Sequence, residues 1–239
     1  MRAEQGEWAM RPFEGMKVVD LTHVLAGPFS TYQLALLGAD VVKVEAPGLG
    51  EYMRQRGADE VLRKNLMGDH YLCQNANKRS LVVDLKNARG QDVVRRLAAG
   101  ADVVVENYRA GVVDCLNLGY GALAALNPRL VYCSLKAYGA TGPKGRLPGW
   151  DHNIQAASGL MMATGTAAAT PLKTGAPVID YASGTMAAFA VAAALLQRER
   201  TGKGQFIDVS MLDTALMLMS PMVASCLMTG HAPQPHGND

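Results

Sequence analysis

The chain has little net charge and no long apolar run, and each of these shortages excludes a class of protein. A formal net charge of +2 over 239 residues leaves no basic excess of the kind that nucleic-acid binding requires, so we expect no nucleic-acid partner. The longest apolar run, "MAAFAVAAALL", is too short to span a membrane and charged residues follow it closely. We therefore expect no membrane association.

Cysteine is also scarce, which predicts a reducing environment. The four cysteines form no CxxC pair, and the start of the chain lacks the charged and apolar segments of a signal peptide. We therefore expect a cytoplasmic protein without disulfides. All four thiols are predicted to be buried as small apolar side chains: Cys73, Cys115, Cys133 and Cys226.

Several motifs that carry chemistry are absent. The turn after the first predicted strand is "THVLAGPFS", which has no GxGxxG, and the sequence contains no P-loop, HExxH or GxSxG motif. NAD binding, P-loop chemistry, a zinc site and a serine-hydrolase triad therefore lack support, and we predict no metal and no tightly bound cofactor. His23 and His152 lie near strand ends, where a structural role is favoured over a role in a site.

Short β-branched runs alternate with helical patterns along the chain, which predicts an α/β fold. Strands that are apolar on both faces indicate a doubly wound, Rossmann-like parallel sheet with helices on both faces, although the strand order stays open. The expected strands are Lys17–Leu21, Ala39–Glu45, Ser80–Leu85, Ala101–Asn107, Leu130–Lys136 and Gln205–Ser210. The expected helices are Gly27–Gly38, Asn87–Ala99, Asp151–Gly159, Ala182–Arg200 and Met211–Met228, the last broken or kinked at Pro221. The Met-rich face of that last helix suits a core or a contact with another chain.

Polar residues follow the predicted strands, where ligands of such sheets gather. We expect them to converge on one rim: Glu45, Asp84, Asn107, Lys136, Asp151 and, after the extended piece "APVI", Asp180. Two interpretations of Asp180 stay open and are about equally supported. It is either the N-cap of the next helix or a nucleophile, which Ala182, Ser183 and Gly184 would let a ligand approach. For the basic pair Lys78 and Arg79, a solvated turn is favoured.

Seven segments together resemble a known family. They are "GMKVVDLTHVLAGPFSTYQLALLGADVVKVEAPGLGE", "NANKRSLVVDLK", "DVVVENYRAGVVD", "LNPRLVYCSLKAYGATGP", "GWDHNIQAASGLMMATG", "PVIDYASGTMAAFAV" and "RTGKGQFIDVSMLD", in order from Gly15 to Asp213. They are similar to the family III CoA-transferases, the group of formyl-CoA transferase, carnitine CoA-transferase and α-methylacyl-CoA racemase. The resemblance implies acyl-CoA and a small carboxylic acid as substrates.

The resemblance assigns roles to individual residues. Asp180 matches the family's nucleophilic aspartate, which forms a mixed anhydride with the acyl group and releases CoA thiolate. Lys86 and Arg109 would meet phosphates, and Tyr108 would pack near the adenine or pantetheine. The full set of implied CoA-binding residues is Leu25, Ala26, Val83, Asp84, Leu85, Lys86, Asn107, Tyr108, Arg109, Trp150 and Asp151.

Some positions depart from the best-known members. Leu25 replaces a glutamine near the substrate of formyl-CoA transferase, and Ala46 and Cys115 replace CoA-contacting arginines, for which Lys86, Arg109 or Arg146 would substitute. Trp150 replaces the histidine that racemases carry before the aspartate of their GHD motif, and His152 lies after Asp151. A transferase is therefore favoured over the alternative, a racemase-like enzyme.

The family also sets an expectation for domains and assembly. Residues 1–228 match the CoA-binding large domain, and residues 229–239 are expected to be a linker toward a small domain that the sequence does not contain. Family members form interlocked homodimers of ring-shaped subunits. A chain ending at Asp239 would not close the ring, so that dimer is not expected, and an inactive CoA-binding fragment is the third interpretation.

Overall fold

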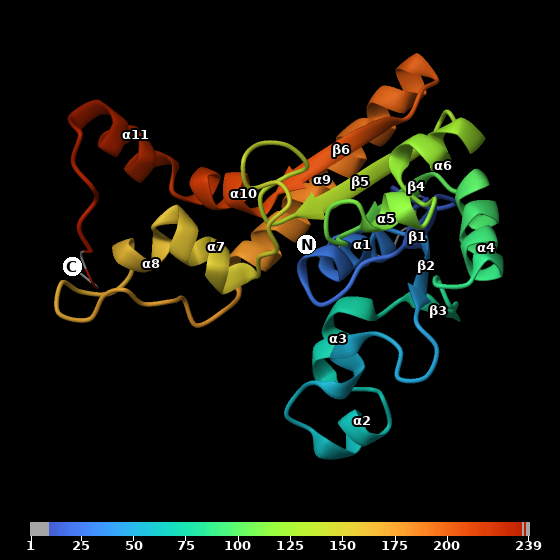
Figure 1. The fold of residues 1–239 in the computed structure, drawn as a ribbon, viewed down its shortest axis with the longest axis horizontal. Helices are drawn as coiled ribbons and strands as arrows, with labels where there is room; N and C mark the ends of the chain where they lie inside the picture. The colour runs from blue at the N-terminus through green and yellow to red at the C-terminus, as the bar shows by residue number, and fades with distance from the viewer. Residues whose placement is uncertain (1–9, 236, 238–239) are drawn as a thin grey trace.

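The computed structural model describes residues 10–235 and 237. The region in which no signal peptide is expected, and part of the predicted linker, therefore lie outside the described residues. Within them, six parallel strands form one sheet in the order β3-β2-β1-β4-β5-β6 (Figure 1). The strands are β1 (Lys17–Asp20), β2 (Asp40–Glu45), β3 (Lys78–Val82), β4 (Val103–Glu106), β5 (Val131–Lys136) and β6 (Gln205–Ser210). The predicted doubly wound α/β fold is confirmed.

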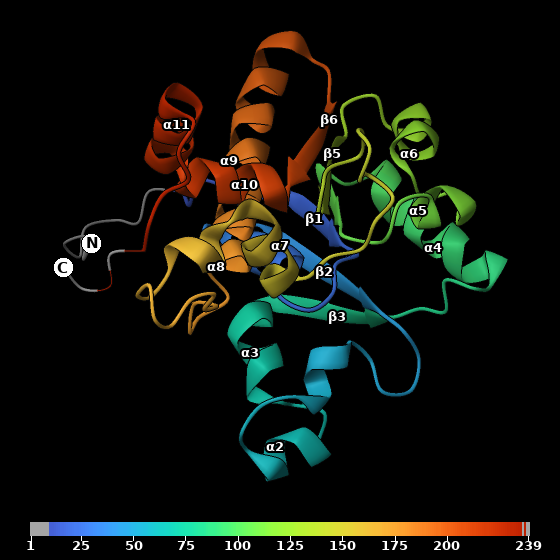
Figure 2. The same cartoon turned by 60° about the vertical axis from the view of Figure 1, so that its left-hand side comes forward.

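Helices cover both faces of the sheet and bury two apolar cores. On one face α1 (Ala26–Leu36) and α9 (Val178–Thr201) pack together and over the sheet, and on the other lie α4 (Ala88–Ala99) and α6 (Tyr120–Leu126). Residues of β4 alternate between the two cores, because successive side chains of a strand point to opposite faces. Figure 2 shows α9 on one side of the sheet and α4 and α6 on the other.

The third strand begins and ends earlier than the sequence predicted. It covers Lys78–Val82 rather than residues 80–85, and pairs with β2 from Val41–Lys78 to Glu45–Val82. This strand lies at the edge of the sheet, so its polar residues have one exposed side and it lacks the two-sided apolar pattern of a central strand. The chain leaves the sheet after Val83, whose N–H donates to the Glu45 carbonyl oxygen.

A small lobe between β2 and β3 was largely missed by the sequence analysis. It contains η1 (Tyr52–Gln55), α2 (Glu60–Lys64) and α3 (Asp69–Asn75). These helices are too short to show a helical apolar period. The other short helices are α5 (Val112–Cys115), α7 (Asp151–Ser158) and α8 (Leu160–Ala163).

Helix α9 is longer than predicted and includes Val178 and Ile179, the second half of the piece "APVI" that was expected to be extended. It begins at Val178 after the N-cap Pro177, so Asp180 lies in its first turn. Its 24 residues are long and apolar enough to cross a membrane, and the bent pair of the next two helices passes the same test. However, Ile179, Ala187 and Val191 are buried against the sheet and α1, as in a core helix.

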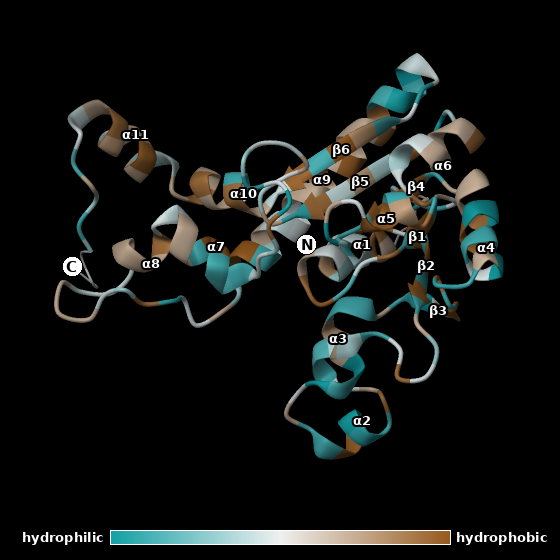
Figure 3. Cartoon of the chain, in the orientation of Figure 1, coloured by the Kyte–Doolittle hydropathy of each residue, from teal (hydrophilic) through white to brown (hydrophobic). Residues whose placement is uncertain are grey.

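The predicted break at Pro221 is confirmed. Helices α10 (Met211–Leu218) and α11 (Ser220–Thr229) meet at an angle of 78°, with the proline in the first turn of α11. Met211 and Ala215 are buried in the core, but Leu227 and Met228 are more than four-fifths exposed. The apolar end of α11 is brown in Figure 3, in contrast to the teal surface of α4.

The prediction that all four thiols are buried is wrong. All four cysteines are free, but only Cys133, in the middle of β5, is fully buried. Cys73 and Cys115 are exposed at the outward sides of α3 and α5, and Cys226 in α11 is half-buried. Cys73 and Cys115 lie on short helices at the surface, and amino-acid composition alone does not predict this exposure.

Candidate functional site

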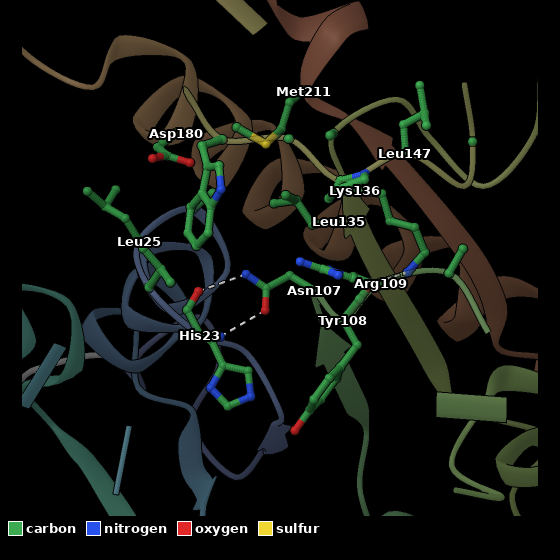
Figure 4. A pocket seen from close by; sticks show the side chains of 18 residues that line it. His23, Leu25, Asn107, Tyr108, Arg109, Leu135, Lys136, Leu147, Asp180 and Met211 are labelled. Atoms are coloured by element: carbon green, nitrogen blue, oxygen red, sulfur yellow. Dashed lines mark hydrogen bonds between the residues drawn. The ribbon is translucent and has the colours of Figure 1, made fainter. Parts of the chain in front are cut away.

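A cavity of about 310 Å³ lies at the carboxyl ends of β1, β4 and β5, and Asp180 is on its wall (Figure 4). Three segments from different parts of the chain line most of it: the turn 23–26 after β1, residues 107–110 after β4, and residues 145–150. Parallel strands end at the same edge of a sheet, so the fold gathers these segments. The cavity therefore brings together Leu25, Ala26, Asn107, Tyr108, Arg109, Trp150 and Asp180, all singled out from the sequence.

Asp180 does not cap its own helix. It is the third residue of α9, and the N–H groups of Ile179 and Asp180 donate to Oδ2 of Asp151 over 2.8 and 3.0 Å. Asp151, from α7, therefore satisfies two of the free donors at the start of α9. The Asp180 carboxylate is left available to the cavity.

The two carboxylates affect one another. Burial raises the pKa of Asp180 to about 7, and the negative charge of Asp151 adds to this shift. Near neutral pH the Asp180 side chain is therefore divided between its acid and carboxylate forms. A perturbed carboxyl group in a cavity is a common property of catalytic residues.

Asp151 is fixed by a hydrogen-bond chain behind the cavity wall. Its Oδ1 accepts a short hydrogen bond from Gln155, and Oε1 of Gln155 accepts the N–H of Thr174 over 2.9 Å. Asp151 and Gln155 are buried, and neither lines the cavity. The structure thus places Asp151 behind the cavity wall, where it binds the first turn of α9, and not among the cavity residues with which a CoA contact was expected.

The turn after β1 is held by side chains from other strands. Both the N–H and the hydroxyl of Thr22 donate to Asp20, and Nζ of Lys43 donates to the Thr22 carbonyl oxygen over 2.8 Å. Asn107 bonds His23 twice, accepting its N–H and donating to its carbonyl oxygen, both over 2.8 Å (Figure 4). This pair ties the end of β4 to the turn.

The cavity wall is less cationic than the sequence suggests. Lys136 donates to Glu106 over 2.9 Å and to the Tyr108 carbonyl oxygen over 3.1 Å, so its charge is neutralised. Burial lowers the pKa of His23 to about 4, so this imidazole is uncharged, and it meets the Tyr108 ring edge-on at 5.0 Å. Arg109 is exposed, and it forms no ion pair within the described part of the chain. It is therefore an available cation beside the cavity.

The residues expected at the end of β3 lie outside this cavity. Val83 packs into the core, Asp84 and Lys86 are exposed, and Leu85 is half-buried beside the core. A smaller cavity of about 160 Å³ lies at the ends of β2 and β3, and its lining includes Glu45, Ala46, Arg54, Ser80 and Val82. The expectation of one rim is therefore wrong: the first cavity is lined by Asn107, Lys136 and Asp180 and the second by Glu45, whereas Asp84 and Asp151 line neither.

Two expectations from local sequence are wrong. Lys78 does not lie in a solvated turn, because its side chain is 1% exposed and donates to Asp20 over 2.9 Å. Ser183 and Gly184 do not open the site to a ligand, since both are buried. A Cβ at Gly184 would lie 2.6 Å from the Ala26 carbonyl oxygen, so its absence lets α9 approach α1. Arg79, as expected, is exposed and pairs with Asp40.

Sequence reasoning missed the buried polar groups beneath the turn. Asp20, Lys43 and Glu51 are almost completely buried. The available signal was a charged residue inside an apolar strand, as in "VVD" and "VVKVE". Among residues 10–235 and 237, no group of three or more metal-ligating side chains is present.

A doubly wound sheet with a carboxylate on the wall of a strand-end cavity defines a class of α/β ligand-binding domain. The comparisons narrow this class: residues 13–239 match the model of "CoA-transferase family III". The chain belongs to this family.

Similar proteins agree with this assignment. The chain is 42% identical over 220 residues to the succinyl-CoA:glutarate CoA-transferase of Mus musculus, covering 92% of this chain and 50% of that protein. It is 41% identical to the acetyl-CoA:oxalate CoA-transferase of Acetobacter aceti, covering 95% and 58%. A crystal structure of a CAIB/BAIF family protein from Brucella suis matches with a TM-score of 0.89 and 37% identity, over 96% of this chain and 61% of that one. The chain thus spans about half the length of the curated relatives it matches.

Proposed function

We propose that this protein is an acyl-CoA:carboxylate CoA-transferase in which Asp180 is the nucleophile. The observation that carries the proposal is the position of its carboxyl group, half-buried in the first turn of α9 on the wall of the strand-end cavity. The names of both relatives join an acyl-CoA to a dicarboxylate, so we propose a small carboxylic acid as the acceptor.

The reaction begins with the carboxylate form of Asp180. One of its oxygens attacks the carbonyl carbon of the acyl thioester, the C–S bond breaks, and its electron pair leaves with CoA as the thiolate. The product on the protein is an acyl-aspartyl mixed anhydride. The CoA thiolate then attacks the Asp180 carbonyl carbon, which releases the donor as its carboxylate and leaves an aspartyl-CoA thioester. The acceptor carboxylate attacks this thioester and releases the thiolate, which attacks the acyl carbon of the acceptor, so that the new acyl-CoA forms and the Asp180 carboxylate is regenerated.

The cavity residues bind CoA in this proposal. The backbone of Leu25 and Ala26 lies along the thioester arm, and Asn107 keeps this turn in place. Arg109 meets a phosphate, and Tyr108 packs on the adenine or pantetheine. Lys86 and its neighbours at the end of β3 are proposed as a more distant contact for the nucleotide end of the molecule.

Two other functions are less well supported. A racemase-like enzyme would require a histidine directly before Asp151, but Trp150 occupies that position and His152 is exposed on α7. Exchange of the α-hydrogen of a 2-methylacyl-CoA in deuterated water would reveal such an activity. An inactive CoA-binding fragment would bind CoA in a titration without any turnover.

Asp180→Ala tests the proposed function. Wild-type protein should transfer CoA within a panel of acyl-CoA donors and small carboxylic acids, and the variant should not. Asp92→Ala is the matched control, because Asp92 is an exposed carboxylate on α4 that does not line the cavity. Equal transfer by Asp180→Ala and wild type would refute the role of Asp180.

A further inference from the structure

The turn after β1 contains a residue in an unfavourable conformation. Val24 has a φ of 70°, in the left-handed region that β-branched residues rarely occupy. Val24 also lines the cavity, together with His23 and Leu25. Backbone strain of this kind persists only where surrounding groups enforce it, so some contact must hold Val24 in place.

That contact is the carboxylate of Glu51, which is 1% exposed. Its Oε1 accepts the N–H of Val24 over 2.8 Å, and its Oε2 accepts the N–H of Met53 over 2.9 Å. No ion pair to Glu51 is present in the described part of the chain. Both oxygens are therefore engaged by backbone donors, and one of these belongs to the strained residue.

Glu51 is itself rigidly supported. Its own N–H donates to Oε2 of Glu45 over 2.9 Å. Glu45 also accepts two hydrogen bonds of 2.6 Å from Arg54 and one of 2.7 Å from Ser80. The end of β2, the loop after it and η1 therefore form one fixed unit from which Glu51 reaches the turn.

The three residues of the turn are held from three directions. Lys43 bonds the carbonyl oxygen of Thr22, Asn107 bonds both backbone groups of His23, and Glu51 bonds the N–H of Val24. Only the last of these contacts acts on a strained residue. Leu25, which follows directly, lies between Asp180 and His23 in Figure 4.

We propose that Glu51 is a positioning residue: it holds Val24 in the left-handed conformation and so fixes the backbone of Leu25 and Ala26 along the bound acyl-CoA. The ligand in this statement rests on the proposed function, whereas the action of Glu51 on the turn does not. Glu51 does not touch the cavity, so its effect is transmitted through Val24.

Glu51→Gln tests the proposal with two measurements. The amide cannot accept both N–H groups, so we expect hydrogen exchange of residues 21–26 to become about tenfold faster while α9 is unchanged. Calorimetric titration should show CoA binding about tenfold weaker. Glu60→Gln, the same substitution at an exposed residue of α2, should change neither quantity.

A second background separates positioning from a general structural role. Glycine adopts positive φ without cost, so in Val24→Gly the same Glu51→Gln change should weaken CoA binding by only about twofold or less. Val24→Asn is a substitute if the glycine variant does not fold, since asparagine also tolerates this region.

These measurements test the positioning role of Glu51 separately from the proposed CoA-transferase function. An unchanged CoA Kd in Glu51→Gln overturns it, and so does a loss of equal size in the Val24→Gly background. If wild-type protein binds no CoA, the proposed function has failed, and exchange in the turn alone decides: faster exchange in Glu51→Gln supports the action on Val24, and unchanged exchange overturns it.

Discussion

Two carboxylates share the start of α9, and they have different tasks. Asp151 accepts the free N–H groups of Ile179 and Asp180, whereas the Asp180 side chain faces the cavity. The helix end thus stabilises the charge of Asp151, while burial raises the pKa of Asp180. Environment, rather than residue type, distinguishes the cap from the proposed nucleophile.

Asp151→Asn should shift the pH dependence of the first chemical step. The rate of CoA release requires ionised Asp180, so in wild type it should rise with pH through about 7. Removing the nearby negative charge favours ionisation, so the apparent pKa should fall. Burial, the larger cause, remains, so the pKa should stay above the ordinary aspartate value. A profile unchanged from wild type would contradict the electrostatic coupling.

Lys78→Met should destabilise the protein strongly. Lys78 is almost completely buried and donates to Asp20, to Asn75 and to the Pro28 carbonyl oxygen. Its removal takes one cationic partner from the buried Asp20 carboxylate, which keeps Lys43, Thr22 and Thr31, and should cost about 3–5 kcal/mol in the free energy of unfolding. Arg79→Met is the neighbouring control: its ion pair is exposed and should contribute about 0–1 kcal/mol. Urea unfolding measures both, and equal losses would refute the argument from burial.

At the scale of elements, the close contact of α9 with α1 places Asp180 beside the turn. Gly184 is buried where the two helices meet, near Ala26 and Phe29. A helix as apolar as α9 could pack in several ways, but only a residue without a side chain permits this approach. The position of the proposed nucleophile therefore depends on a glycine one turn further along the helix.

Gly184→Ala should destabilise the helix pair. The added Cβ would lie 2.6 Å from a backbone oxygen of α1, and the resulting overpacking should cost about 1–3 kcal/mol. Gly121→Ala in α6 is the matched control. Nothing lies within 4 Å of its added Cβ, so it should stabilise by about 0.5–1 kcal/mol. Thermal unfolding should therefore move in opposite directions for the two variants.

Elements with a strong pattern were predictable from sequence, and those without one were not. The apolar runs of β1, β2, β4 and β5 fixed a parallel sheet, because such strands are buried on both faces. The edge strand β3 has polar residues, and it begins two positions and ends three positions earlier than predicted. Helix α9 begins earlier than predicted. The free N–H groups of Ile179 and Asp180 in its first turn donate to Asp151, a partner distant in sequence that no local pattern reveals.

At the scale of the whole molecule, binding of CoA should stabilise the folded chain. With free CoA at one hundred times its Kd, linkage adds about 2.7 kcal/mol to the free energy of unfolding, or about 5–10 °C in the melting temperature. Arg109→Ala should reduce this shift, since it removes the available cation beside the cavity. Arg96→Ala, an exposed arginine on α4, should retain it. A full shift in Arg109→Ala would contradict the phosphate role.

The site could be predicted only in part, because some of its contacts join residues that are far apart in the sequence. Residues after β1, after β4 and in the first turn of α9 were identified because strand ends converge and because the segments resemble a family. The polar groups beneath the turn bind residues far away in the sequence: Lys43 is 21 residues from its partner Thr22, and Glu51 is 27 residues from its partner Val24. A charged residue inside an apolar strand marks Asp20 and Lys43 in the sequence, but no local pattern identifies their partners, so the roles of Lys78 and Glu51 became evident only in the folded structure.

The central claim is that Asp180 carries the acyl group, and trapping of that intermediate tests it most directly. Wild-type protein and Asp180→Ala would be incubated with an acyl-CoA and hydroxylamine, and the peptide containing residue 180 analysed by mass spectrometry. We predict a hydroxamate at Asp180 and release of CoA thiol in wild type, and neither in the variant. Release of CoA that is equally fast in Asp180→Ala would contradict the account.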